Sequence, residues 1–303
     1  MAAGGSTKVI VLSLFANLGI AVSKFAGYAF TSSASLLAEA VHSVADCVNQ
    51  ALLLLGAHRA KRPPDARHPL GYGREIFFWS FIVAILLFSM GGLFAIYEGV
   101  HKLKHPGEIT NPGVAAGILL IGIVLETVSF VACLKEVRKN NPYPNLWVWM
   151  RSSTAAELLV IFLEDAAALA GLVMAIACLA IAWATGDSFY DAAGSIAIGV
   201  LLVVVAVLLA REIKALLLGE APQGKDYEGE IARIVAETIP GGKLLRFIAL
   251  QTGGDELMVS FKVSPGEVRD VLTLIGKINE AERRIKERFP EVRWQFAEPD
   301  REA

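Results

Sequence analysis

The stretch SLLAEAVHSVADCVNQ (residues 35–50) is apolar enough for a membrane helix, yet it carries polar side chains at a regular spacing. Four of them lie three or four residues apart and share one helix face, namely Glu39, His42, Asp46 and Asn49. An ionised side chain at the centre of a bilayer costs at least about 2.5 kcal/mol, so a membrane helix keeps several only for a function or for pairing with neighbouring helices. Histidine and aspartate four residues apart can ligate one cation. This stretch predicts a polar site inside a membrane.

The composition of the chain also indicates a membrane protein. Of its 303 residues, 54% are hydrophobic and 19% are charged, and its mean hydropathy is +0.52. Ordinary soluble domains are less apolar. The net charge of -2 and the local placement of Lys and Arg give no support to nucleic-acid binding. The cysteines lie in apolar segments without a CxxC pair, which favours packing over a disulfide framework or a thiolate metal site; they are Cys47, Cys133 and Cys178.

Six apolar segments of roughly 20 residues each have the length that a bilayer core requires. They cover residues 9–30, 35–57, 76–97, 114–134, 155–183 and 191–210. Lys and Arg between the segments gather on one side, and the other side has only Lys102 and Lys104, so both chain ends are expected in the cytoplasm. Lys24, inside the first segment, is expected to extend toward the membrane surface. We expect a short tail (1–8), a membrane domain (9–218) and a cytosolic domain (219–303).

After Gly219 the hydropathy falls and the sequence pattern changes. Apolar residues recur with helical spacing over 227–238 and 268–285, and strands are indicated over 244–250, 257–263 and 292–296. The order α-β-β-α-β predicts a small α+β domain of the ferredoxin-like kind. A domain of about 80 residues folds alone only marginally, so packing against a second copy is expected. It contains no His or Cys, so a regulatory zinc site there would need carboxylates alone.

Two motifs in tandem carry a family resemblance: LLAEAVHSVAD (36–46) and, in the loop that follows, RPPDARHPLGYGRE (62–75). With the six spans and the α+β tail, the chain resembles the cation diffusion facilitator family of divalent-metal transporters. The resemblance implies a homodimer, formed through the cytosolic domain and the membrane helices, that exchanges Zn²⁺ for protons by alternating access. It implies no cofactor and no enzymatic activity. Mn²⁺, Fe²⁺ or Co²⁺ transport is one alternative, and a non-transporting membrane metal sensor or scaffold is another.

The resemblance also implies a four-ligand transport site on the second and fifth spans. Three of its ligands correspond to His42, Asp46 and Asp165. Where many members carry a fourth ligand, one turn before Asp165, this chain has Ile161. Glu164, Glu39 or a water molecule are the candidates for the missing position. Three protein ligands with a water suit tetrahedral zinc, and a more oxygen-rich set also suits Mn²⁺.

The loop motif departs from the family pattern at one position. Members often bind a second metal there through one Asp and two His; Asp65 and His68 match, and Tyr72 replaces the second His. Because tyrosine is a poor zinc ligand, two alternatives stay open: a weak metal site, or a connector whose path is fixed by Pro and Gly. Glu126, inside the fourth span, has two possible roles, in proton coupling or in a contact between helices.

The expected direction of exchange follows from ligand chemistry. A ligand must be deprotonated to coordinate a metal, so a site that faces the cytosol loads metal, and one that faces a more acidic side loads protons. This predicts proton-coupled Zn²⁺ efflux, for which we expect a bacterial plasma membrane. An intramembrane metallohydrolase is disfavoured, because the chain has no HExxH motif.

Overall fold

A computed structural model describes residues 3–31, 34–105, 112–139, 145–223 and 225–301; within the second helix, the side chains of 34–42 lie outside the described residues. The chain forms two compact units. The first comprises Met1–His58, Ile76–Asn141 and Ala156–Lys214. The second comprises Arg59–Glu75, Pro142–Ala155 and Ala215–Ala303.

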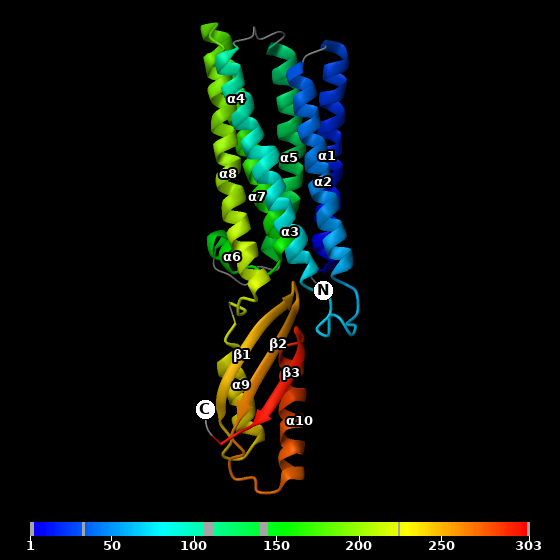
Figure 1. The fold of residues 1–303 in the computed structure, drawn as a ribbon, viewed down its shortest axis with the longest axis vertical. Coiled ribbons are helices and arrows are strands. Elements are labelled where there is room, and N and C mark those ends of the chain that lie inside the picture. Colours follow the sequence, from blue (N-terminus) through cyan, green and yellow to red (C-terminus); the bar gives the residue numbers. More distant parts are fainter. Residues whose placement is uncertain (1–2, 32–33, 106–111, 140–144, 224, 302–303) are drawn as a thin grey trace. The chain divides into compact units, whose positions relative to one another are not determined.

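The first unit is a bundle of long helices (Figure 1). In the described chain, five helical stretches are long and apolar enough to cross a membrane, namely Thr7–Ala26, Glu75–Lys104, Gly113–Lys139, Ala156–Thr185 and Phe189–Leu218. They belong to α1 (Ala3–Thr31), α3 (Glu75–Leu86) with α4 (Phe94–Lys104), α5 (Pro112–Lys139), α7 (Ala156–Thr185) and α8 (Phe189–Leu218). The helix with the polar stripe, α2 (Ala34–Arg59), completes the bundle. The predicted helical membrane domain is confirmed, and several helices extend beyond their predicted ends.

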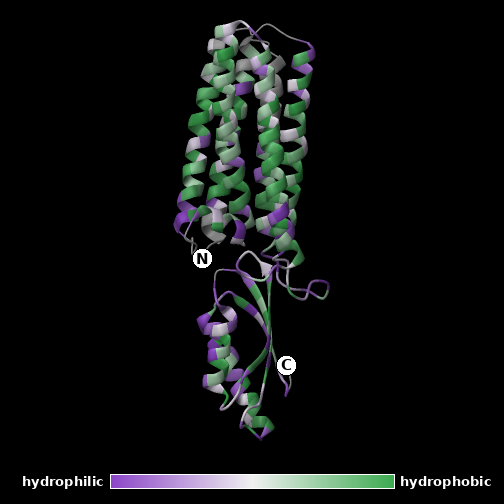
Figure 2. Cartoon of the chain, turned by 90° about the vertical axis from the view of Figure 1, so that its left-hand side faces the viewer, coloured by the Kyte–Doolittle hydropathy of each residue, from purple (hydrophilic) through white to green (hydrophobic). Residues whose placement is uncertain are grey.

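The first half of α7 is buried on all sides. Five consecutive residues there are buried, and five residues make more than one helical turn, so the whole circumference is covered. They are Leu158, Leu159, Val160, Ile161 and Phe162. By contrast, α1 and α5 expose large apolar side chains such as Phe15 and Val124. Figure 2 shows that the helices of the bundle are mostly hydrophobic along their length, as contact with lipid requires.

The third membrane span contains a π-helical segment, η1 (Leu87–Leu93), between α3 and α4. π-Helical turns within α-helices often lie at functional sites. At Gly92, a Cβ atom would lie 2.6 Å from Cγ2 of Val203 on α8, so glycine allows the two helices to touch. Leu87 and Gly91 of the same segment line the cavity described below. The sequence pattern did not predict this change of helix type.

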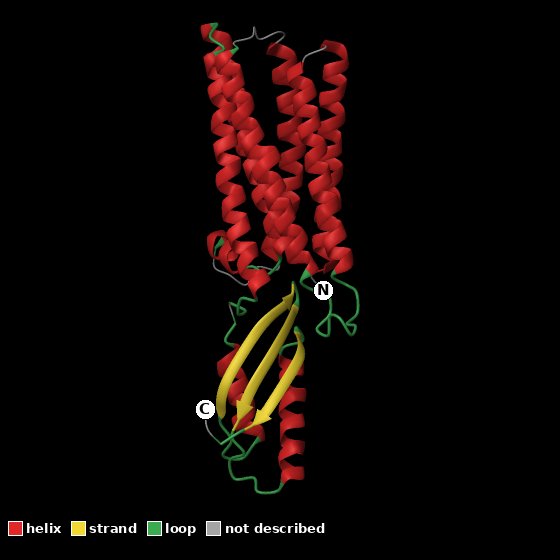
Figure 3. Cartoon of the chain, in the orientation of Figure 1, coloured by secondary structure: helices red, strands yellow, loops and turns green. Residues whose placement is uncertain are grey.

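The second unit contains the predicted C-terminal α+β domain, with α9 (Tyr227–Thr238), β1 (Leu244–Gly253), β2 (Glu256–Val263), α10 (Val271–Arg288) and β3 (Val292–Pro299). The sheet order is β1-β2-β3, with β1 antiparallel and β3 parallel to β2 (Figure 3). Both helices cover one face of the sheet, as Figure 2 shows edge-on. The predicted α-β-β-α-β order is confirmed.

Alternation along β2 builds the core of this domain. Every second side chain is buried under the helices, namely Leu257, Val259, Phe261 and Val263. α10 begins three residues later than its apolar pattern predicted, because Asp270 caps it by accepting a hydrogen bond from the backbone N–H of Thr273 (2.8 Å). The alternating pattern of the strand and the apolar stripes of the helices therefore predicted which side chains form this small core.

The second unit also includes two connectors from between the membrane helices. Arg74 donates a hydrogen bond to the carbonyl oxygen of Gln251 (3.2 Å), and the Thr154 hydroxyl donates to the carbonyl oxygen of Gly254 (3.0 Å). Gln251 lies near the end of β1, and Gly254 lies in the turn between β1 and β2. A short helix that was not predicted, α6 (Leu146–Ser152), lies in the second connector.

Candidate cation site

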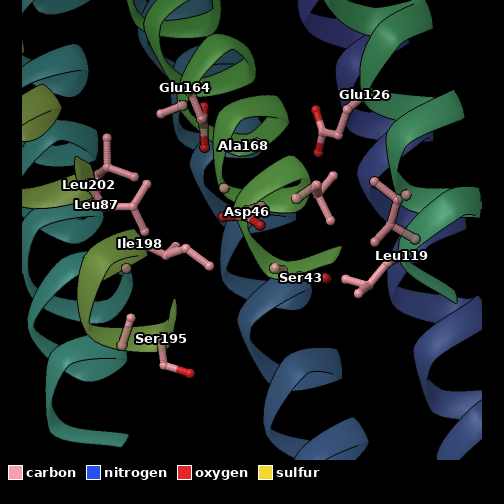
Figure 4. A pocket seen from close by; sticks show the side chains of 18 of the residues that line it. Ser43, Asp46, Leu87, Leu119, Glu126, Glu164, Ala168, Ser195, Ile198 and Leu202 are labelled. Carbon is pink, nitrogen blue, oxygen red and sulfur yellow. The ribbon is translucent and has the colours of Figure 1, made fainter. Parts of the chain in front are cut away.

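A cavity of about 190 Å³ lies within the helix bundle, lined by side chains of α1, α2, η1, α4, α5, α7 and α8 (Figure 4). Its ionisable lining residues are Lys24, Asp46, Glu98, Lys102, Glu126, Glu164 and Asp165. A cavity of this size with several ionisable side chains on its wall has room for a cation together with water molecules. Acidic side chains outnumber basic ones, so the lining favours a positively charged occupant.

Asp165 projects from α7 into this cavity and is 1% exposed. Its Oδ2 atom accepts a hydrogen bond from the Ser129 hydroxyl of α5 (2.7 Å). A hydroxyl donor to one oxygen fixes the orientation of a carboxylate and leaves its other lone pairs for a further partner. The sequence predicted Asp165 as a ligand but did not identify Ser129, because serine is common in membrane helices as a packing residue.

Glu164 has a different environment, although it is the next residue of α7. Its Oε1 accepts a hydrogen bond from Asn49 Nδ2 (3.1 Å) and its Oε2 accepts one from Gln50 Nε2 (3.0 Å). Both donors belong to α2, so this carboxylate joins α2 to α7. Asn49 and Gln50 lie one helical turn beyond Asp46 on α2. Asp46 itself lines the same cavity as Asp165.

The remaining ligand candidates of α2 are His42 and Glu39. Their side chains lie outside the described residues, so both assignments stay predictions. In the described chain, no three or more His, Cys, Asp or Glu side chains form a group that could hold a metal ion. Ile161 is fully buried (0% exposed) among apolar neighbours, so the position that carries a ligand in many family members supplies no polar atom here.

Lys24 does not extend to the membrane surface, and that prediction was wrong. Its side chain is buried and lines the cavity, where Nζ donates a hydrogen bond to the Ser43 hydroxyl of α2 (2.9 Å). Acidic lining residues provide the physical reason, because a buried ammonium group needs negative partners and hydrogen-bond acceptors. Ser43 directly follows His42 in the α2 motif. Its place in this polar stretch was the only feature of the sequence that could have indicated it as a partner of Lys24.

The loop candidates Asp65, His68 and Tyr72 lie together outside the bundle. Asp65 Oδ1 accepts hydrogen bonds from the backbone N–H groups of Arg67 (2.9 Å) and His68 (2.7 Å), and Oδ2 accepts one from the Tyr72 hydroxyl (2.6 Å). His68 Nδ1 is 3.6 Å from Asp65 Oδ1, and the His68 and Tyr72 ring centroids are 4.2 Å apart. These hydrogen bonds, the one from Tyr72 above all, lower the pKa of Asp65, and the same bond raises the pKa of Tyr72.

A model of the cation efflux transmembrane domain matches residues 10–218, which is more than half of the chain. The chain therefore belongs to the cation efflux family, also called the cation diffusion facilitator family, which is a family of membrane transporters. The resemblance inferred from the helix and loop motifs is confirmed.

Three relatives illustrate the range of the family. Metal tolerance protein C4 of Arabidopsis thaliana is 34% identical over 225 residues, covering 73% of this chain and 49% of that protein. The human mitochondrial proton-coupled zinc antiporter SLC30A9 is 33% identical over 226 residues, covering 74% of this chain and 40% of that protein. The metal cation efflux system protein CzcD of Cupriavidus metallidurans is 27% identical over 126 residues, covering 42% and 39%. Each match spans less than half of the relative's length.

Proposed function

We propose that this protein exports Zn²⁺ across a membrane in exchange for protons. The observation that carries the proposal is that Asp46 of α2 and Asp165 of α7 line one cavity inside an apolar bundle of the cation efflux family. The name of a relative, a proton-coupled zinc antiporter, supports the choice of Zn²⁺ and of protons. Because the matches cover only part of each relative, the activity is argued from the site itself.

In this proposal, His42, Asp46 and Asp165 bind the cation and give up their protons to do so. The Ser129 hydroxyl orients Asp165, and Glu164 holds α7 against the two amide side chains of α2. The cation then leaves toward a more acidic compartment, where protons replace it. A ligand cluster inside the bundle that opens to alternate sides is the common solution among transporters.

The test is Zn²⁺ flux into proteoliposomes under an imposed pH gradient, with a zinc-sensitive dye and a proton-sensitive dye read in parallel. Wild type is compared with Asp46→Asn, Asp165→Asn and, as a control for loss of a carboxylate elsewhere in the bundle, Glu136→Gln. We expect both Asp variants to lose coupled flux and the control to keep it. Zinc flux in either Asp variant equal to wild type would contradict the proposal.

Two alternatives can be separated in the same assay. The many carboxylates of the cavity also suit Mn²⁺, and less directly Fe²⁺ or Co²⁺, so each metal is tested in turn. A membrane metal sensor or scaffold would bind zinc in detergent without moving it across a sealed bilayer. The buried Ile161 is the observation that favours this second alternative, because it leaves the predicted cage one ligand short.

The protein is further proposed to work as a homodimer with both termini in the cytosol, in a bacterial plasma membrane. On α10, Val271, Leu272 and Ile275 are exposed, and Leu272 is 78% exposed, which supports a second copy as the covering surface. Light scattering in detergent tests the dimer, and accessibility of introduced cysteines from either side of the membrane tests the orientation.

A further inference from the structure

Glu126 is a buried carboxylate that is not among the ligand positions implied by the family resemblance. It lies on α5 and is 7% exposed, and its Oε2 atom has no hydrogen-bond partner among the described residues. Burying a polar atom without a hydrogen-bond partner is unfavourable, because it loses its hydrogen bonds to water and gains none in the protein. Acidic residues inside membrane helices are kept mainly where they act on a substrate or a proton.

The position of Glu126 on α5 follows from its neighbours along the helix. Ser129, one turn further, donates to Asp165, and the Cys133 thiol, a second turn further, lies 3.8 Å from the carbonyl oxygen of Leu158. Residues spaced by three and four share one helix face, so Glu126 lies on the face of α5 that contacts α7. It is separated from Ser129 by about 4.5 Å of helix rise.

Glu126 therefore faces the same cavity as the two aspartates. Figure 4 shows its side chain reaching from α5 toward α7. The charged groups that act on it are Asp165, Asp46 and Lys24, from three other helices. Asp46, Glu126 and Asp165 line this cavity but do not form a ready-made metal-binding group. A divalent cation that enters the cavity would draw carboxylates from α2, α5 and α7 toward it, and it would supply the partner that the buried oxygen lacks.

We propose that Glu126 is a further ligand of the transported cation, contributed by α5 in addition to Asp46 and Asp165. This inference rests on the proposed function, namely that a cation passes through the cavity. Glu126 would replace the ligand that is missing at Ile161. It lies on α5, whereas the site implied by the family resemblance lies on α2 and α7. The resulting set is rich in oxygen, so it accepts Mn²⁺ as well as Zn²⁺.

The experiment measures Zn²⁺ and Mn²⁺ affinity of the purified full chain by calorimetry in detergent, together with proteoliposome flux. Glu126→Gln keeps the size and one oxygen of the side chain but removes its charge, and Glu126→Asp keeps the charge on a shorter stem. Glu136→Gln is the matched control, because Glu136 lies near the C-terminal end of the same helix and is not among the residues that line the cavity. Gel filtration monitors folding of each variant. We expect Glu126→Gln to weaken the binding of both metals roughly ten- to a hundred-fold, Glu126→Asp to weaken it less, and the control to bind as wild type.

The outcomes separate this inference from the proposed function. If wild type binds and transports zinc while Glu126→Gln keeps wild-type affinity, the inference fails and the transporter stands, even when flux is lower. Such a result would mean that Glu126 acts on packing or on the conformational change. If wild type neither binds nor transports a divalent metal, the proposed function fails and Glu126 has no cation to bind. Should Glu126→Gln misfold, the affinity of Glu126→Asp decides: wild-type affinity for both metals overturns the inference.

Discussion

Asp65 in the loop and Asp165 in the membrane cavity both match ligand positions of the family, yet their surroundings differ. Asp65 is exposed, and donors of its own loop engage both of its oxygens. Asp165 is buried, and its described donor comes from another helix, α5. Glu164 and Glu126 repeat the contrast inside the cavity, because two amides engage Glu164 and Glu126 has an oxygen without a described partner.

Sequence position alone therefore does not separate a metal ligand from a structural carboxylate. A carboxylate whose acceptor sites are filled by protein donors must lose those hydrogen bonds before it coordinates a metal. A buried carboxylate with an open lone pair gains a partner when a cation arrives. We therefore expect Asp165 to bind the cation and Glu164 and Asp65 to maintain local structure.

The largest effect is expected for Asp165→Asn. The amide oxygen still accepts the hydrogen bond from Ser129, so folding is preserved, but the charge that binds the cation is lost. We expect zinc affinity, measured by calorimetry in detergent, to fall by roughly a hundred-fold. Affinity within threefold of wild type would mean that Asp165 is not a ligand. Its buried position would then not distinguish it in function from Asp65 of the loop.

A smaller effect is expected for Ser129→Ala, which keeps the charge and removes the donor that orients it. We expect zinc affinity to fall by roughly ten-fold. Thr127→Ala is the matched control, since the Thr127 hydroxyl is exposed and donates to the carbonyl oxygen of Ile123 in its own helix (2.6 Å). Equal effects of the two substitutions would mean that Ser129 contributes packing rather than orientation.

Glu164→Ala is expected to affect stability more than binding. The substitution removes the acceptor of the side-chain amides of Asn49 and Gln50. We therefore expect the free energy of unfolding in detergent to fall by about 1–2 kcal/mol. Zinc affinity of the folded protein should stay within threefold of wild type. A loss of affinity as large as that of Asp165→Asn would instead identify Glu164 as a ligand.

The smallest effect on transport is expected in the loop. Tyr72→Phe removes the hydrogen bond that contributes most to the lowered pKa of Asp65, so that pKa should rise toward its ordinary value of 3.8. In wild type, the loop contacts of Asp65 are complete above this value and are lost as the pH falls through the lower pKa of the folded protein. Carbon-13 NMR of Asp carboxyl groups, with Asp65→Asn for assignment, measures the shift.

Zinc flux of Tyr72→Phe should equal that of wild type. The metal alternative for this loop makes a different prediction, because Asp65 and His68 would then hold a second zinc ion. Loss of one bound zinc equivalent in Asp65→Asn and in His68→Ala, counted by mass spectrometry of the intact protein, would favour that alternative over the connector.

Much of the architecture was predictable from the sequence. Long apolar segments define membrane helices because backbone polar groups in lipid must bond within the helix. The alternation along β2 and the stripes of α9 and α10 predicted the C-terminal domain because one face of each element is buried. The family motifs likewise identified Asp46 and Asp165, both of which line the cavity.

From the sequence came the membrane-spanning helices, the α-β-β-α-β order of the C-terminal domain and the candidate ligands of α2 and α7. The contacts of each polar group were visible only in the folded molecule: two amides donate to Glu164, a hydroxyl donates to Asp165, Lys24 donates to Ser43, and Glu126 borders the cavity. The physical reason is that periodicity reports which face of a helix is polar, whereas hydrogen bonds and cavities depend on which faces of different helices are packed together.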